Sequence, residues 1–146
     1  MAINTYKTFL MKASTTTSTS FTKLVDIKTK PRLIGTKEGL DATTMSDPIQ
    51  IFIDGIITID QSGYEFEANW DKTTYTTLKA LEGAENKFAV WYGGTESGGV
   101  ATPTGSDGKF VFNGYLTVSD AEASVNAVQN MIINIRPTTG VDFSGT

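Results

Sequence analysis

Residues 64–92 read YEFEANWDKTTYTTLKALEGAENKFAVWY and predict a strand, a helix and a second strand in succession. Apolar and polar residues alternate over 64–70, which predicts a strand with one buried and one solvated face. Glu65 and Glu67 lie on the solvated face. Residues 87–92 are apolar on both faces and predict a central strand. Because period-2 alternation dominates the rest of the chain, we expect a mainly β fold with one helix.

The helix over residues 71–83 has a signal at each end. Asp71 is a favourable N-cap, since its carboxylate can accept backbone N–H groups of the first turn, and Gly83 can end the helix in a left-handed conformation. The helix contains four threonines, which are poor helix formers, so packing on the sheet must hold it. We expect four side chains to form the helix–sheet core, the first two spaced as a hydrophobic staple: Trp70, Tyr75, Leu78 and Leu81.

The composition excludes several kinds of chemistry. The 146 residues include no histidine and no cysteine, so the commonest general base is missing and a zinc site of the usual sulfur type is excluded. The net charge of -4 predicts a surface that repels phosphate backbones. The start of the chain lacks the apolar core of a signal peptide, and apolar runs are far shorter than the roughly 20 residues of a membrane helix. We therefore expect one cytoplasmic domain over 1–146, without enzymatic activity, cofactor, metal or membrane insertion.

Outside the central unit, alternation predicts strands over 6–11, 21–27, 110–118 and 131–136, and two strands within 48–60 separated by a break at Asp54–Gly55. Asn113–Gly114 is either a hairpin turn or a bulge within one strand. Three segments lack a clear period, and we expect a long loop that offers a contact surface, a mobile glycine-rich loop and a loose tail: 28–47, 93–109 and 137–146.

The acidic residues were the only candidates for a metal or catalytic site. Asp41, Asp47, Asp54 and Asp60 recur every six or seven positions, which does not match a calcium-binding loop. Asp54 and Asp60 are interpreted as turn residues beside Gly55 and Ser62, and Glu65 and Glu67 as members of a solvated strand face. The aromatic residues occur at strand spacing without interleaved Lys and Arg, so they are expected to pack in the core and not to stack on nucleic-acid bases.

An ordered series of segments resembles the major tail tube proteins of bacteriophages with long non-contractile tails, particularly those that infect Gram-positive hosts. The series spans about residues 20–138 and consists of FTKLVDI (21–27), LDATTMSD (40–47), YEFEANW (64–70), DKTTYTTLKALEG (71–83) with KFAVWYG (87–93), DGKFVFNGYLTV (107–118) and NMIINIRP (130–137). The resemblance implies a β-sandwich or partial barrel of antiparallel strands flanked by one helix. It also places Asn113–Gly114 inside one strand, which favours the bulge.

The same resemblance implies a function in the virion tail. Such subunits form hexameric rings that stack into a hollow tube, which conducts DNA to the host without binding it specifically. Assembly would take place in the host cytoplasm, with a tape-measure protein and other tail proteins as partners. We expect Glu65 and Glu67 to face the lumen, because an acidic wall repels phosphates. The long loop 28–47 is expected to reach a neighbouring subunit, with five interface candidates: Leu33, Ile34, Leu40, Thr43 and Met45.

Three other functions remain open at the level of sequence. A tail-terminator, distal-tail or head–tail joining protein would share a related β fold, but a terminator stops at one ring. A carbohydrate-binding module would expose two or three aromatic side chains in a row and carry a signal peptide. A small enzyme would need acid–base groups, which the composition does not supply.

Overall fold

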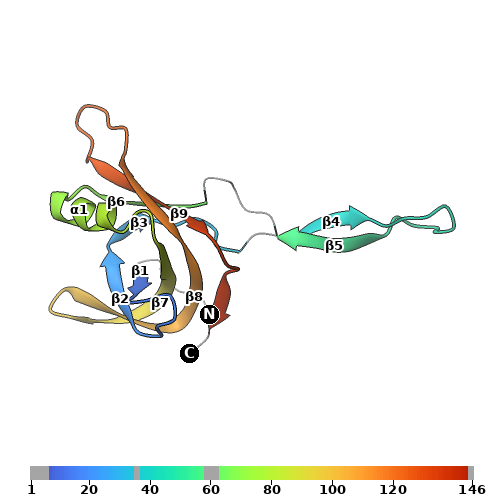
Figure 1. The fold of residues 1–146 in the computed structure, drawn as a ribbon, viewed down its shortest axis with the longest axis horizontal. Helices are drawn as coiled ribbons and strands as arrows, with labels where there is room; N and C mark the ends of the chain where they lie inside the picture. Colours follow the sequence, from blue (N-terminus) through green and yellow to red (C-terminus); the bar gives the residue numbers. More distant parts are fainter. Residues whose placement is uncertain (1–6, 35–36, 58–62, 145–146) are drawn as a thin grey trace.

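The computed structural model describes residues 7–34, 37–57 and 63–144, and within them the fold is mainly β with one short helix, as predicted (Figure 1). The elements are β1 (Thr8–Ala13), β2 (Phe21–Val25), β3 (Ile27–Thr29), β4 (Lys37–Asp41), β5 (Phe52–Ile57), β6 (Tyr64–Asn69), α1 (Lys72–Ala80), β7 (Glu85–Ser97), β8 (Val100–Asp120), β9 (Asn130–Pro137) and β10 (Asp142–Ser144).

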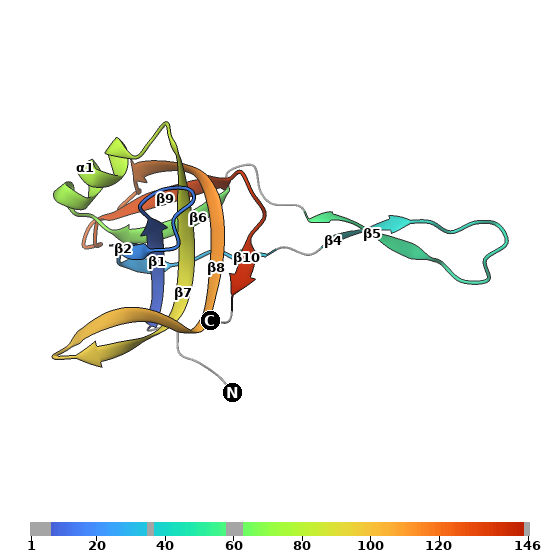
Figure 2. The same ribbon diagram turned by 60° about the horizontal axis from the view of Figure 1, so that its bottom comes forward.

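The main sheet is antiparallel and curls back on itself. Its strand order is β2-β1-β7-β8-β9-β6-β3, and β10 pairs with β8. Although β2 and β3 stand at opposite ends of this order, only Asp26 separates them in the chain. The segment 21–29 therefore pairs with β1 through its first part and with β6 through its second part. This arrangement closes the sheet into the partial barrel that Figures 1 and 2 show.

The barrel interior is packed by alternate side chains of its strands. Phe66, Phe88, Phe112 and Ile133 are at most 1% exposed, and β6 alternates buried and open positions as predicted. A second, smaller cluster lies on the outer face of β1 and β7. β7 is paired with β1 at one edge and with β8 at the other, and the successive residues Phe88, Ala89 and Val90 are fully buried on alternate faces, which confirms the central strand.

Helix α1 begins and packs much as expected. The Asp71 side chain accepts the Thr74 N–H at 3.1 Å, and Leu78 is fully buried against the barrel core. Trp70 differs from its prediction, because it is 41% exposed and contacts Tyr75 at a ring-centroid distance of 4.7 Å. Its own N–H bonds the Gln129 carbonyl at 3.0 Å, where the chain leaves the sheet, so the indole lies at the rim and not in the core.

The C-terminal end of α1 is shorter than predicted. The last helical residue is Ala80, with Leu81 as C-cap, and the Leu81 and Glu82 N–H groups bond back to the carbonyls of Leu78 and Lys79. Gly83 does take the left-handed conformation, with φ of 87°, but it belongs to the turn that leads into β7. Leu81 is half-buried and packs on the core, as does Tyr75.

Residues 93–109 are not a mobile loop but the paired arm of β7 and β8. The two strands remain paired up to Ser97 and Val100, and the turn between them uses Gly98 and Gly99, both at positive φ. A register shift follows Tyr92, where Gly93 has φ of 95°. The glycines therefore serve a tight turn and an irregular ladder position, which composition alone does not distinguish from a flexible loop.

Two further segments are more regular than expected. Asn113–Gly114 lies inside β8, which confirms one continuous strand. The pairing with β7 is unbroken at both residues and β9 pairs from Gly114 onward, so neither a hairpin nor a bulge forms. The 137–146 segment contains β10, which pairs with β8 between Lys109 and Val111.

The 28–47 segment is also partly strand. It starts with the end of β3 and finishes beyond β4, which pairs with β5 in a separate two-stranded sheet. The predicted break at Asp54–Gly55 does not end the strand, because β5 runs through it and Asp54 pairs with Gly39. An irregularity does occur there, since the register with β4 shifts between this pair and Lys37–Ile57. The second predicted strand of this region falls mostly on residues 58–62, outside the described part.

Candidate assembly surfaces

The β4–β5 hairpin, residues 37–57, stands away from the barrel in both views (Figures 1 and 2). Leu40 pairs with Ile53 across the two strands, and Ile51 follows on the same face by strand alternation. These three side chains are 44%, 55% and 40% exposed, respectively. We call them the apolar face of the hairpin. Large apolar side chains continue toward the tip, where Ile49 is 71% exposed and Met45 is fully exposed.

The opposite face carries the exposed Phe52 beside Asp41, and polar groups organise this face and the tip of the hairpin. Asp41 accepts the Thr43 N–H at 2.9 Å and the Gln50 side-chain amide at 3.3 Å. Hydrogen bonds from Thr43, followed by that from Gln50, lower the pKa of Asp41. Asp47 accepts both the N–H and the hydroxyl of Thr44, at 2.7 and 3.1 Å. These carboxylates shape the turn and give the hairpin an acidic side.

The five interface candidates do not all lie on the hairpin. Leu40, Thr43 and Met45 do, and the Thr43 hydroxyl accepts the Ile51 N–H at 2.7 Å. Leu33 is 4% exposed and belongs to the barrel core, where its carbonyl accepts the Tyr64 hydroxyl at 2.6 Å. It therefore offers no surface to a neighbour. Ile34 is 40% exposed and lies beside a shallow pocket at the base of the hairpin.

The sequence pattern did not reveal that isoleucines in β5 and in the segment before it face outward. Alternation had placed Ile49, Ile51 and Ile53 on one strand face, and an apolar face is ordinarily assigned to the core of the same chain. Only the strand order, in which β4 and β5 form a sheet of their own, indicates that this face is exposed.

Glu65 and Glu67 belong to a polar outer face of the barrel. Glu65 pairs with Asn134, which pairs in turn with Thr117, so that the three side chains form a row across β6, β9 and β8. Glu65 is exposed, whereas Glu67 is half-buried and accepts the Asn130 side-chain amide at 2.7 Å. We call these five residues the polar face.

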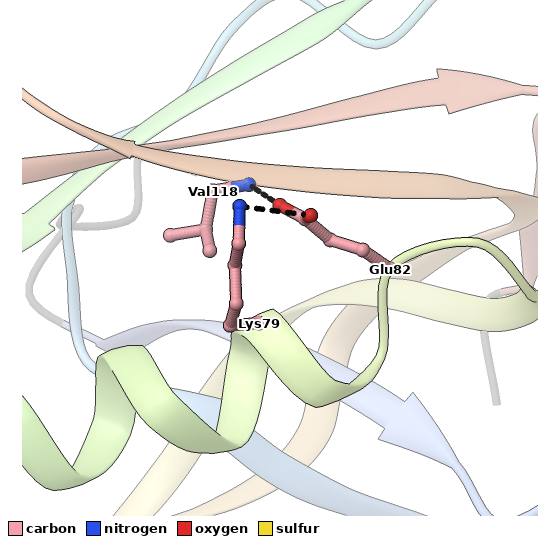
Figure 3. A network of polar contacts seen from close by, with 3 residues as sticks. All are labelled: Lys79, Glu82 and Val118. Atoms are coloured by element: carbon pink, nitrogen blue, oxygen red, sulfur yellow. Dashed lines mark hydrogen bonds and ion pairs between the residues drawn. The ribbon is translucent and has the colours of Figure 1, made fainter.

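A polar network joins α1 to the far half of β8 (Figure 3). The Glu82 carboxylate accepts the Val118 N–H at 2.9 Å and contacts the Lys79 ammonium at 3.1 Å. The β7 ladder has ended at Glu85 and Tyr115, so this N–H needs another acceptor. The Val118 N–H, and then Lys79, lower the pKa of Glu82. The network fixes the helix on the open edge of the strand.

Two other properties bear on function. Within residues 7–34, 37–57 and 63–144, no group of three or more acidic side chains is arranged to hold a metal ion. Over the same described residues, no helix has the length and hydropathy needed to cross a bilayer.

Comparison with known proteins finds no matching family model and no matching curated protein. Among solved structures, the fold is similar to that of a chain in the cryo-EM structure of the anti-feeding prophage (AFP) baseplate, 6-fold symmetrised. The TM-score is 0.65 at 8% sequence identity, and the match covers 99% of this chain and 97% of that chain. The likeness therefore concerns the fold, over nearly the full length of both chains.

Proposed function

We propose that this chain is a structural subunit of a phage-like tail assembly, and more specifically the subunit of a tail tube. Six copies would form a ring, and rings would stack into a hollow tube that conducts DNA. The observation that carries the proposal is the β4–β5 hairpin, whose apolar face is exposed away from its own barrel. The fold that the chain shares with a component of a six-fold symmetrised baseplate supports it.

The hairpin needs a partner for physical reasons. A two-stranded sheet is marginally stable at best by itself, and a cluster of exposed apolar side chains marks an interaction surface. Because the hairpin extends away from its own barrel, the partner is another molecule. A contact between two different surfaces of identical subunits either closes into a ring or continues as an open polymer, and a stacked tube uses both outcomes.

The polar face is proposed to line the lumen. Glu65 and Glu67 would place carboxylates on that wall and offset the charges of Lys28, which bonds Asn130 at 3.0 Å, and of Arg136 on the same face. A wall without a surplus of positive charge lets DNA slide past without being held. The remaining partners in this proposal are a tape-measure protein and other tail proteins, and the subunit would be assembled in the host cytoplasm into the virion.

A second candidate is a distal-tail, tail-terminator or head–tail joining protein. The observation in its favour is that the similar chain comes from a baseplate. The two candidates differ in polymer length, since a tube subunit stacks many rings and a terminator forms one.

Negative-stain electron microscopy with light scattering, at low and high protein concentration, tests both candidates. Hollow tubes support the tube subunit and single rings support the second candidate, while a monomer at every concentration contradicts self-assembly of this chain alone.

The double variant Ile51→Ser and Ile53→Ser should keep the far-UV circular dichroism of the barrel but lose the assemblies. Gln50→Ser is the matched control, because Gln50 directly precedes Ile51 and lies on the opposite face by strand alternation. Normal tubes from the double variant would exclude the hairpin as an interface.

A further inference from the structure

We infer that the loop between β8 and β9 (121–129) of one copy inserts its turn at Val125 into the pocket at the base of the hairpin of the next copy. The inference rests on the proposed self-assembly and adds a second contact to that of the hairpin. A second contact is needed because the apolar face of the hairpin consists of three half-exposed side chains, whereas a stable interface covers about 800 Å² on each partner.

Hydrogen bonds hold the β8–β9 loop in a defined shape at both ends. At its base the Ala121 N–H bonds the Asn130 carbonyl at 3.1 Å, and the Gln129 side-chain amide bonds the Ala121 carbonyl at 2.8 Å. At its tip the Ala127 N–H bonds the Ser124 carbonyl at 3.2 Å. The loop is therefore an organised projection of the barrel.

The tip of this loop presents apolar side chains to solvent. Val125 is almost fully exposed, and Val128 is exposed as well. The third residue of the turn, Asn126, has φ of 64°, a conformation that asparagine adopts more readily than most residues. A loop that is fixed by hydrogen bonds and still leaves β-branched apolar side chains in water is suited to contact another surface.

The pocket at the base of the hairpin offers a matching hollow. Its volume is about 280 Å³, and an engineered cavity of about 150 Å³ is large enough for benzene, so a valine side chain can enter. Two threonines and a glycine complete a lining that otherwise consists of larger, mostly apolar side chains: Leu33, Ile34, Tyr64, Pro137 and Val141.

A second hollow is less suitable for an apolar side chain. It has a volume of about 350 Å³ and lies between the tip of the β7–β8 arm, at Val100, and the junction of β2 and β3. The ion pair of Lys23 and Asp26, with its atoms 2.9 Å apart, forms part of that lining. Covering ionised groups with an apolar side chain removes their hydration at a cost. In contrast, the described residues that line the pocket at the base of the hairpin include no charged side chain.

Charge does not select the pocket, and apolar fit and position do. The loop contains one charged residue, Glu122. Next to the lining residues in the chain stand two basic and two acidic residues, which balance each other: Arg32, Arg136, Glu65 and Asp142.

The loop and the pocket lie at opposite ends of the same two strands. β9 begins at Asn130, directly after the loop, and ends at Pro137 in the pocket lining. Its neighbour β6 begins at Tyr64, also in the lining, and ends beside Trp70, whose N–H bonds the Gln129 carbonyl. The eight residues of β9 span about 24 Å, so the two sites meet only between different copies. Their contact runs head to tail, which is the arrangement that propagates a polymer.

The pocket is continuous with the hairpin. Ile34, in its lining, precedes the start of β4 at Lys37 by three residues. In both views the β8–β9 loop and the hairpin lie on opposite sides of the barrel (Figures 1 and 2). A neighbour that inserts its loop therefore lies against the base of the hairpin, and the two contacts belong to one interface.

Disulfide mapping tests the inference directly, because the chain has no cysteine of its own. A tagged Val125→Cys protein is mixed with an untagged Gly140→Cys protein under assembly conditions, oxidised and examined on a non-reducing gel. Two rival pairs are measured in parallel. Met45→Cys with Gly140→Cys reports the hairpin tip in the pocket, and Val125→Cys with Val100→Cys reports the loop in the second hollow.

We expect the mixed dimer of the first pair to exceed both rivals by about tenfold at a subunit concentration of about 0.1 mM, since groups held in contact react at an effective concentration in the millimolar range.

Filling the pocket gives an independent readout. A Cβ at Gly140 would meet no heavy atom within 4 Å, so Gly140→Leu adds a side chain at the pocket without displacing the barrel. This variant should reduce assembly by about tenfold or more, because the added side chain obstructs the incoming turn. Gly140→Ala is the matched control and should assemble normally. Far-UV circular dichroism checks that both variants fold.

Dimers confined to either rival pair, or normal assembly of Gly140→Leu, would overturn the inserted loop while leaving the proposed function intact. If neither assemblies nor cross-links form, the inference and the proposed function both fail.

Discussion

The bond from Val118 to Glu82 gives a quantitative test of how α1 is held on the barrel. Val118 is 2% exposed, and its N–H has the Glu82 carboxylate as acceptor at 2.9 Å. A hydrogen bond to a charged group contributes about 1.5–3 kcal/mol, and a buried donor left without a partner costs about 1–3 kcal/mol. The Glu82 side chain is 24% exposed, so water can partly replace it. We therefore expect Glu82→Ala to lower the free energy of unfolding by about 1.5 kcal/mol, the lower end of that range.

Two companion variants separate the hydrogen bond from the ion pair. Glu82→Gln keeps an acceptor oxygen but loses the charge, so its loss should be about half that of Glu82→Ala. Lys79→Ala removes only the contact with a lysine that is 55% exposed, and should cost about 0.5 kcal/mol or less. Urea denaturation followed by tryptophan fluorescence measures all three. A Glu82→Ala loss no larger than that of Lys79→Ala would refute the capping role.

The same bond predicts a pH dependence. The pKa of Glu82 is lowered below its ordinary value of 4.5 in the folded protein, so the unfolded state binds the proton more readily. The stability that the charge contributes is complete above the unfolded pKa and is lost as pH falls through the folded pKa. The stability difference between the natural protein and Glu82→Gln should therefore shrink below pH 4.5. A difference that stays constant or grows there would contradict this linkage.

Two further substitutions test the core and the backbone. Leu78→Ala should cost about 2–5 kcal/mol, whereas Thr77→Ala, at an exposed position of the same helix, should change stability by about 0.5 kcal/mol or less; equal losses by urea denaturation would mean that α1 does not pack as described. Gly63→Ala should cost about 1–3 kcal/mol, because Gly63 has φ of 80° and a Cβ there would lie 2.5 Å from the Ile135 carbonyl oxygen. An unchanged melting temperature for this variant would refute that close approach.

Local signals in the sequence were sufficient for the helix and its flanking strands. Asp71 at the N-cap and Leu78 in the buried stripe depend on interactions within a few residues or on one face of one helix. The alternation over 64–69 likewise reports which side of a strand is buried, because the β6 side chains obey a strict period of two. These features are encoded locally, and they were predicted correctly except for the position of Trp70 and the last helical turn.

Features that depend on distant pairing were not predictable in the same way. The bridging of β1 and β6 by residues 21–29 is visible only once the sheet closes, because the sequence shows one strand there. Residues 93–109 contain the glycines and polar residues of a loop, yet most of their partners are each other. This paired arm meets a hydrophobic cluster only at residues such as Ala101, so it has no strong hydrophobic period. In the core strands, burial of one face imposes an alternation of apolar and polar residues. The outer parts of β7 and β8 lack that alternation, so they were not predicted as strands.

The apolar face of the hairpin sets a limit on how strong one contact between subunits can be. Complete burial of a side chain such as Leu or Ile is worth about 1.5–3 kcal/mol, and Leu40, Ile51 and Ile53 have already buried about half of their surface. Seating them on a neighbour therefore adds roughly 1 kcal/mol each, or about 3 kcal/mol in total. A millimolar complex needs about 4 kcal/mol, so one hairpin contact alone leaves the subunit monomeric.

In a ring, however, every further contact forms within an assembly already held together, at an effective concentration in the millimolar range. A hairpin of this strength thus permits a free, folded subunit and still supports a polymer, provided that many contacts form together.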